Sequence, residues 1–385
     1  MAYLDHAASA PMSASCREAM LPWMGQRFGN PSGSHSVARA AREAIEDARD
    51  DIADILGARA REIVFTGGGT EAINLAVAGT THPSPKTIIT SAIEHDAVRE
   101  AVIARTAHGE HHVVAPVDAN GVVQLDALAD LLSAHTNEVR LVAVMAVNNE
   151  VGTIQPVAGV IDAVRRLAPR CLVLVDAVQG ALWLDPATFN SADLTVISAH
   201  KFGGPQGVGA LRVTEGTDLS PILHGGGQER ERRSGTQNVA GIVGMAAAFR
   251  ETDQQRDRVA GPISARRDRL VDGLIARIPT IIETSHRSTK VAGNAHLCVG
   301  AVESESLLVL LDDGDICASA GSACASGAIH TSPVLAAMGV AKNFAEGALR
   351  LTLGSTTTDA DIERALVVIP AAVESLRAGR PISAS

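Results

Sequence analysis

Three short apolar runs in this chain each end abruptly in polar side chains, and this pattern constrains the fold more than any other feature. The runs are Leu141–Val147, Leu172–Val175 and Thr195–Ile197, followed by Asn148-Asn149, Asp176 and Ser198-Ala199-His200-Lys201. Such runs are typical of strands buried in a parallel sheet. Since ligands of open α/β sheets bind at the carboxyl ends of the strands, the pattern predicts an α/β fold with one polar site.

Lys201 and Asp176 are the most informative residues of this pattern. Lys201 precedes Phe202-Gly203-Gly204-Pro205, which ends any regular element. A half-buried lysine beside a cation can lose its proton and form a Schiff base with a carbonyl, although a surface lysine in a turn would have the same sequence. A carboxylate that ends an apolar strand, as Asp176 does, is costly without a partner. Pyridoxal phosphate needs such an amine for its aldehyde and such an acid for its ring nitrogen.

An anion site is also predicted near the N-terminus. Residues 38–55 have apolar side chains at alternating spacings of three and four, which predicts an amphipathic helix ended by Gly57. A strand at 62–66 then leads through Gly67-Gly68-Gly69-Thr70 into a helix. Glycines at such a turn expose N–H groups to an anion, although a plain strand-to-helix turn is the alternative. No Gly-Lys pair follows, which excludes a nucleotide P-loop.

Composition narrows the function classes. With 385 residues and 46% hydrophobic content, the chain can form two domains. The formal net charge of -10 argues against direct nucleic-acid binding. No apolar run reaches the ~18 residues of a membrane span and no signal peptide is evident, so we expect a cytoplasmic protein. Five scattered cysteines indicate reduced thiols, with Cys171 and Cys298 in the core and Cys317 buried.

Histidines give weaker signals. His95 lies in Ile93-Glu94-His95-Asp96-Ala97-Val98, where it could cap a helix or take part in proton transfer. The group His108, His111 and His112 could bind a metal, but a solvated loop is the preferred interpretation. His224-Gly225-Gly226-Gly227 is similar to an esterase oxyanion loop, yet no Gly-x-Ser-x-Gly elbow accompanies it.

The C-terminal third contains a candidate nucleophile. Residues 315–327 are small and have little to pack, so a mobile loop is expected, with Cys324 exposed as a nucleophile or as an inert surface thiol. Arg350 lies in a predicted strand, residues 348–354, where its guanidinium could bind a carboxylate or be a rim charge. Residues 359–377 are predicted to form the last helix.

From Tyr3 to Arg377, these motifs in their order resemble the NifS/IscS-like branch of the cysteine desulfurases, within the class V aminotransferase group of fold-type I pyridoxal phosphate enzymes. The resemblance is carried by residues 94–98, 172–179, 195–205 and 224–236, and by Gly321-Ser322-Ala323-Cys324. Two departures are Ser9-Ala10, where the family usually has two threonines, and Ala325, where it has threonine.

The resemblance implies a large domain with a mixed, mainly parallel sheet flanked by helices, and a smaller α+β domain. We expect residues 15–255 to form the large pyridoxal phosphate domain. Residues 1–14 and 256–385 would form the small domain that carries the cysteine loop. The charged stretch 253–269 is predicted to be solvated helix, interrupted at Gly261-Pro262, that leads into the small domain.

The resemblance also implies residue roles. Lys201 would hold the cofactor aldehyde, His95 would stack on the ring and assist proton transfer, and Asp176 would bind the ring nitrogen. Contacts to the cofactor's phenolic oxygen are implied for Asn149 and Gln179, and contacts to its phosphate for Gly69, Thr70, Ser198, His200 and Thr236. Thr236 would serve the neighbouring subunit, which implies a homodimer. Arg350 would bind the substrate carboxylate, with Asn30 and Asn149 bordering the substrate pocket.

The implied reaction converts L-cysteine to L-alanine, with Cys324 taking the sulfur as a persulfide for transfer to an acceptor protein. Iron–sulfur cluster assembly, thiolation and DNA phosphorothioation are all open as destinations. A cysteine C–S lyase that releases pyruvate or a selenocysteine lyase of the same fold is the nearer alternative. A non-catalytic sulfur-carrier scaffold is the more distant one.

Overall fold

The computed structural model describes residues 1–80, 86–321 and 332–379. Within these residues, the main sheet has seven strands in the order β2-β8-β7-β6-β5-β3-β4. Their bounds are β2 (Ile63–Thr66), β3 (Thr87–Ser91), β4 (His111–Ala115), β5 (Val139–Met145), β6 (Leu172–Asp176), β7 (Leu194–Ser198) and β8 (Gly209–Val213). Strands β4, β3, β5, β6 and β7 pair in parallel, whereas β8 is antiparallel to both β7 and β2. The mixed, mainly parallel α/β sheet is therefore confirmed.

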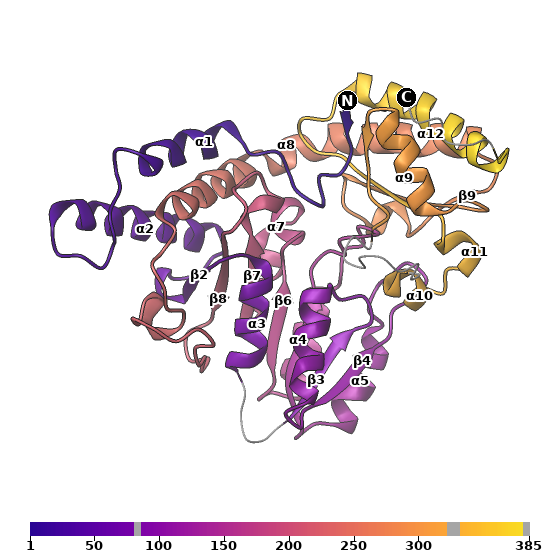
Figure 1. Ribbon diagram of the computed structural model, residues 1–385. Coiled ribbons are helices and arrows are strands. Elements are labelled where there is room, and N and C mark those ends of the chain that lie inside the picture. The colour runs from indigo at the N-terminus through magenta and orange to yellow at the C-terminus, as the bar shows by residue number, and fades with distance from the viewer. Residues whose placement is uncertain (81–85, 322–331, 380–385) are drawn as a thin grey trace.

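Helices cover both faces of this sheet (Figure 1). They are α1 (Ala14–Met20), α2 (Ser36–Ile55), α3 (Gly69–Gly79), α4 (Asp96–Thr106), α5 (Leu125–Ala134), α6 (Val157–Leu167) and α7 (Gly180–Trp183). Side chains alternate between faces along each strand. Thus Ile88 belongs to the apolar cluster under α3 and α4, while its neighbour Ile89 belongs to the cluster under α2, α5 and α6. Burial on both faces explains why the strands are almost continuously apolar.

A smaller part of the molecule has its own apolar cluster, formed by residues near both ends of the chain, such as Leu4 and Ile369. Its antiparallel sheet has the order β12-β10-β9, and β1 pairs in parallel with β11. The strands are β1 (Ala2–Tyr3), β9 (Ile281–Glu283), β10 (Asn294–Val299), β11 (Ile316–Cys317) and β12 (Ala348–Thr352). The helices of this part are α9 (Ser304–Asp313) and α12 (Asp359–Arg377), while the buried side chains of α10 (Pro333–Ala337) and α11 (Lys342–Ala345) belong to the cluster of the main sheet. Figure 1 shows both chain ends here.

One long helix, α8 (Val239–Arg277), passes from the main sheet to the smaller part (Figure 1). The predicted interruption at Gly261-Pro262 is wrong, because the helix continues through Pro262. Proline removes one N–H from the helical ladder. The helix is held beyond this point by Ile263 and Arg267, which are buried. Since Arg256 is buried too, the stretch 253–269 is only partly solvated.

Two further predictions are corrected. His111 and His112 begin strand β4 and are not in a solvated loop, because the segment pairs with β3 and His112 Nε2 lies 2.8 Å from Thr90 Oγ1. No group of three or more His, Cys, Asp or Glu placed to hold a metal occurs among the described residues. Cys317 is half-buried in β11 instead of buried, while Cys171 and Cys298 lie in the core as predicted. No described helix is long and apolar enough to cross a membrane.

Candidate active site

A cavity of about 750 Å³ lies where β5, β6 and β7 end, since Met145, Asp176 and Ser198 all line it. It brings together ten of the residues selected from the sequence. They are Gly69, Thr70, His95, Asn149, Asp176, Gln179, Ser198, His200, Lys201 and Arg350. The predicted single site at the carboxyl ends of the strands therefore exists as a cavity.

Three predicted residues are not placed in this cavity. Asn30 is exposed and its side-chain oxygen accepts a hydrogen bond from the Ser32 N–H at 3.0 Å, within its own loop. Thr236 is exposed and does not line the cavity. Cys324 lies outside the described residues, although Gly321, just before them, lines the cavity.

Lys201 ends the short 3₁₀ turn η4 (Ala199–Lys201) that follows β7. Its Nζ donates hydrogen bonds to the carbonyls of Ala7 at 2.8 Å and Ala8 at 2.9 Å. Gln179 Nε2 donates to the same Ala7 carbonyl at 2.8 Å. The segment after β1 thus crosses the cavity and holds the lysine. These contacts could not be predicted, because backbone carbonyls leave no side-chain signal in a sequence.

Asp176 ends β6, which is the neighbour of β7, as the sequence predicted. Its Oδ1 accepts a hydrogen bond from the Val178 N–H at 2.9 Å. Burial raises the pKa of this carboxyl, while the Val178 amide, His95 and Lys201 act in the opposite direction. A cation beside Asp176 would favour its ionised form.

Glu94 is a site residue that was not selected from the sequence. It is buried, and its Oε1 accepts hydrogen bonds from the Ser91 hydroxyl and, at 3.0 Å, from the Met145 N–H. Its Oε2 is buried with no hydrogen-bond partner in the described part of the chain. Burial, with a further contribution from Asp176, raises the pKa of Glu94 to about 8. The only sequence signal was its position directly before His95.

His95 is both a helix cap and a cavity residue, so the two interpretations of it coexist. As the N-cap of α4, it accepts the Ala97 N–H on Nδ1 at 3.0 Å. A neutral ring in this arrangement carries its proton on Nε2. His200 is neutral at pH 7, because burial and then the charge of Lys201 lower its pKa to about 4.

Gly69 begins α3, and the space beside it is closed to any side chain. A Cβ at this position would lie 3.0 Å from Val178 Cγ2 and 3.5 Å from Ser198 Cβ. No side chain caps the first turn of α3. The N–H groups of this turn are therefore available to an anion, as predicted.

Arg350 lies in β12 as predicted, and its side chain is 3% exposed. Its Nη1 donates to the Asn149 carbonyl at 2.9 Å, and its Nη2 forms a 2.8 Å ion pair with Asp5. The guanidinium is therefore not a rim charge. Asp5 was not selected from the sequence, since nothing in the sequence indicates that it meets a strand about 345 residues later.

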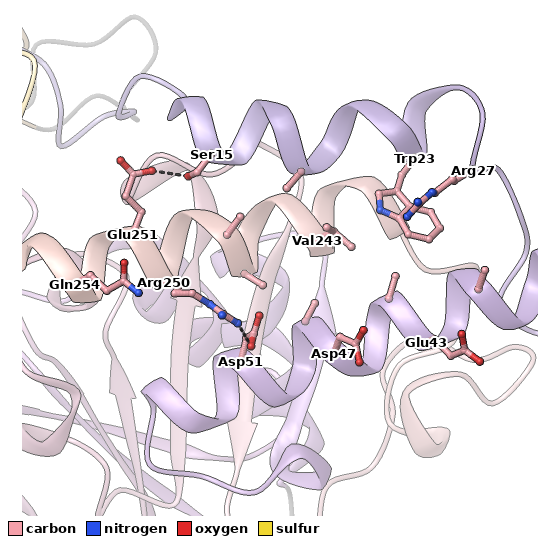
Figure 2. A pocket seen from close by; sticks show the side chains of 16 residues that line it. Ser15, Trp23, Arg27, Glu43, Asp47, Asp51, Val243, Arg250, Glu251 and Gln254 are labelled. Carbon is pink, nitrogen blue, oxygen red and sulfur yellow. Dashed lines mark hydrogen bonds and ion pairs between the residues drawn. The ribbon is translucent and has the colours of Figure 1, made fainter.

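A second hollow, of about 740 Å³, lies between α1, α2 and α8 (Figure 2). Its side chains include several alanines, and its rim is tied by an Arg250–Asp51 ion pair and a Ser15–Glu251 hydrogen bond. None of the residues selected from the sequence lines it. The cavity at the strand ends is therefore the candidate active site.

Comparisons with known proteins agree with this site. Residues 2–365 match the family described as aminotransferase class-V. The chain is 43% identical to an IscS-like cysteine desulfurase of Mycobacterium tuberculosis, over 98% of this chain and 97% of that protein. A solved NifS-like protein is 34% identical with a TM-score of 0.90, covering 97% of this chain and all (100%) of that one.

A further solved structure, DndA from Streptomyces lividans, is 31% identical with a TM-score of 0.76, covering 89% of this chain and 96% of that one. Fold, cavity and full-length similarity thus lead to the same group of proteins. The chain belongs to the class V aminotransferase family, and within it to the NifS/IscS-like cysteine desulfurases.

Proposed function

We propose that this protein is a pyridoxal phosphate-dependent cysteine desulfurase, which converts L-cysteine to L-alanine and carries the sulfur as a persulfide on Cys324. The observation that carries the proposal is the convergence of Lys201, Asp176, His95 and Arg350 on one cavity. Similarity to cysteine desulfurases over nearly the whole chain supports it.

The residues of the cavity fit this cofactor. The corner at Gly69, where a Cβ would crowd Val178 and Ser198, presents the uncapped N–H groups of α3 to the cavity, and a phosphate suits these donors by its charge. Thr70, Ser198 and His200 would add side-chain contacts to the phosphate. Asp176 would bind the ring nitrogen, with Asn149 and Gln179 toward the phenolic oxygen. Lys201 is the amine for the aldehyde.

When bound, pyridoxal phosphate supplies an aldehyde that condenses with amines and a ring that withdraws electrons from the substrate. Asp176, in its ionised form, keeps a proton on the ring nitrogen. Arg350 orients the substrate carboxylate. Lys201, released from the Ala7 and Ala8 carbonyls, is the better candidate to take the α-proton, because His95 Nδ1 is already occupied by the Ala97 N–H. His95 Nε2–H would instead donate a proton within the cavity.

Cys324 performs the sulfur transfer in this proposal. Its thiolate attacks the substrate sulfur, so that an S–S bond forms while the substrate Cβ–S bond breaks. The electron pair of the broken bond is returned to carbon with a proton, and alanine leaves. The enzyme is left with a persulfide, which an acceptor protein then takes. Iron–sulfur cluster assembly, thiolation and DNA phosphorothioation, the last suggested by DndA, are the candidate destinations.

We also propose a homodimer in which Thr236 of one subunit reaches the phosphate corner of the other. Exposure of Thr236 and its position outside the lining of its own cavity agree with this role. Exposed Asn30 would reach the partner's substrate pocket in the same way. The two-domain division, 15–255 against 1–14 with 256–385, is supported by the separate apolar cluster near the chain ends. A cytoplasmic location agrees with the free thiols of Cys16, Cys171, Cys298 and Cys317.

The deciding experiment is product analysis of the holoenzyme incubated with L-cysteine and a reductant. Equal amounts of alanine and sulfide are expected, whereas pyruvate and ammonia would identify a C–S lyase. Cys324→Ser should keep the bound cofactor and lose sulfide release, while Cys317→Ser serves as the matched control. Unchanged turnover in Cys324→Ser would contradict the persulfide step. Absence of cofactor absorbance in the purified protein would favour a sulfur-carrier scaffold, and preference for selenocysteine would favour a selenocysteine lyase.

A further inference from the structure

Arg350 is held by two backbone carbonyls of the cavity wall and by one carboxylate outside the cavity lining. Its Nη1 donates to two backbone carbonyls, those of Asn149 at 2.9 Å and Gly321 at 3.4 Å. Its Nη2 forms the 2.8 Å ion pair with Asp5, which lies in register with Thr352 beside β12. Asp5 itself does not line the cavity, whereas Arg350 does. The carboxylate therefore acts on the arginine from behind.

The contacts of Arg350 engage most of its guanidinium donors. Both hydrogens of Nη1 have carbonyl acceptors, and one hydrogen of Nη2 has Asp5. Nε is buried and has no hydrogen-bond partner among the described residues. The donors without a partner among the described residues are therefore Nε–H, which is buried, and one Nη2–H. An unpaired buried donor costs free energy until a ligand takes it.

Asp5 is also the charge that balances Arg350. Glu150 faces the same guanidinium from the cavity wall, but burial raises the pKa of Glu150 and favours its neutral form. Glu150 Oε2 is engaged by the Ser332 hydroxyl at 2.6 Å. Asp5 is 19% exposed and makes the ion pair. A buried arginine without such a partner would have neither a fixed rotamer nor a compensated charge.

We propose that Asp5 is a positioning residue for substrate binding: its ion pair fixes the Arg350 guanidinium at the cavity wall, where it meets the α-carboxylate of the amino-acid substrate. This inference rests on the proposed function, in which Arg350 binds that carboxylate. Since Asp5 binds Nη2 only through one oxygen, the substrate adds to the ion pair without displacing it. If Asp5 instead competed with the substrate for Arg350, removing the charge of Asp5 would tighten binding of the carboxylate.

The experiment compares two ligands of the same shape in the holoenzyme. 3-Mercaptopropionate has the carboxylate and the thiol of cysteine but no amine, so it cannot condense with an aldehyde, and 3-mercaptopropionamide lacks the charge as well. Their affinities are measured by calorimetry for wild type, Asp5→Asn and Asp5→Glu. Asp315→Asn is the matched control, because Asp315 forms a 2.8 Å ion pair with Arg364 in the same part of the molecule but at the surface.

Asp5→Asn should weaken binding of 3-mercaptopropionate about tenfold, the usual effect of losing a charge-assisted contact. The affinity of the amide should not change. The KM for L-cysteine should rise by a similar factor while kcat stays within about twofold, since the reacting atoms are untouched. Asp5→Glu, which keeps the charge, should lie closer to wild type, and Asp315→Asn should equal wild type.

The proposal would be overturned if Asp5→Asn bound 3-mercaptopropionate as tightly as wild type or more tightly. It would also be overturned if Asp5→Asn lost affinity for the amide and for the acid by the same factor. If Asp5→Asn does not fold, Asp5→Glu takes its place. The proposal would then be overturned if Asp5→Glu lost as much affinity for 3-mercaptopropionamide as for 3-mercaptopropionate. Arg350→Gln separates this inference from the proposed function. If Arg350→Gln binds 3-mercaptopropionate as tightly as wild type, the substrate role of Arg350 itself is refuted. If Arg350→Gln loses this affinity and Asp5→Asn keeps it, only the role of Asp5 is refuted.

Discussion

At the scale of single residues, burial favours the neutral form of several acidic groups of the cavity. The carboxyl pKa is raised by burial for Glu94, Glu150 and Asp176. For Asp176 the Val178 amide, His95 and Lys201 act in the opposite direction, and for Glu150 the Ser332 hydroxyl and Arg350 do. An ionised Asp176 beside a neutral Glu94 would bind a cationic ring nitrogen without a second negative charge in the cavity.

Glu94→Gln should change the pH dependence of stability. The ordinary pKa of 4.5 holds in the unfolded chain and about 8 in the folded one, so Glu94 binds a proton more strongly when folded. Its contribution therefore lowers wild-type stability as pH rises from about 4.5 to about 8. Relative to wild type, Glu94→Gln should be unchanged at pH 4.5 and more stable by about 2–4 kcal/mol at pH 8.5.

Urea unfolding at a series of pH values measures this difference, with the exposed substitution Glu18→Gln as control. A constant difference between Glu94→Gln and wild type across the series would mean that the carboxyl is ionised in the folded state. The same series repeated with the cofactor-loaded protein would report whether ionisation of Asp176 raises the Glu94 pKa further.

At the scale of elements, the sequence predicted most of what builds the cavity. Strands at 141–147, 172–176 and 195–198 were evident because burial on both faces demands continuous apolar side chains, and the polar residues after them became the site. Helix α12 occupies the predicted residues 359–377. Long-range contacts were not predictable in this way. Asp5 and Glu94 obtain their roles from the tertiary fold, and the helix through Pro262 depends on packing that local sequence does not encode.

Gly69→Ala tests the first turn of α3. An added methyl group would approach Val178 Cγ2 at 3.0 Å and enter the corner assigned to the phosphate. The affinity for the cofactor should fall at least about tenfold, because this is the usual effect of losing one charge-assisted hydrogen bond. The fold should be kept. Gly261→Ala in α8, where a Cβ would meet nothing within 4 Å, is the matched control.

Fluorescence titration of the cofactor-free proteins with pyridoxal phosphate gives both affinities. Pyridoxal without phosphate should bind Gly69→Ala and wild type alike. A defect of equal size for both ligands would place the phosphate elsewhere.

At the scale of the whole molecule, the cavity is lined by residues of the main sheet, by Arg350 of β12 and by Ala7 and Ala8 near the beginning of the sequence. Lys201 and Gln179 bind the backbone of Ala7 and Ala8, while Arg350 binds Asp5. Groups from the main sheet and from β12 are thus joined through residues 5–8. The sequence indicated neither this connection nor its partners, because it is made largely by the backbone.

Mixed dimers test whether the site is completed by a second chain. Lys201→Ala and Thr236→Ala proteins should each be impaired alone. Co-expressed with different tags and purified as the heterodimer, they should recover up to half of wild-type sulfide release, because one of the two sites then has both Lys201 and a partner's Thr236. If Thr236 acts within its own chain, no heterodimer site is intact and activity does not recover. A monomer by light scattering would contradict the dimer outright.

The pairing of β1 with β11 has a consequence for the order in which this protein can be built. Ala2 and Tyr3 are synthesised about 300 residues before their partners Ile316 and Cys317. At synthesis rates of about 5–20 residues per second, the first strand waits roughly 15–60 s for its partner. The main sheet can form during that interval. The segment that lines the cavity with Ala7 and Ala8 is therefore made long before the strand that anchors it, so this wall of the cavity is placed late.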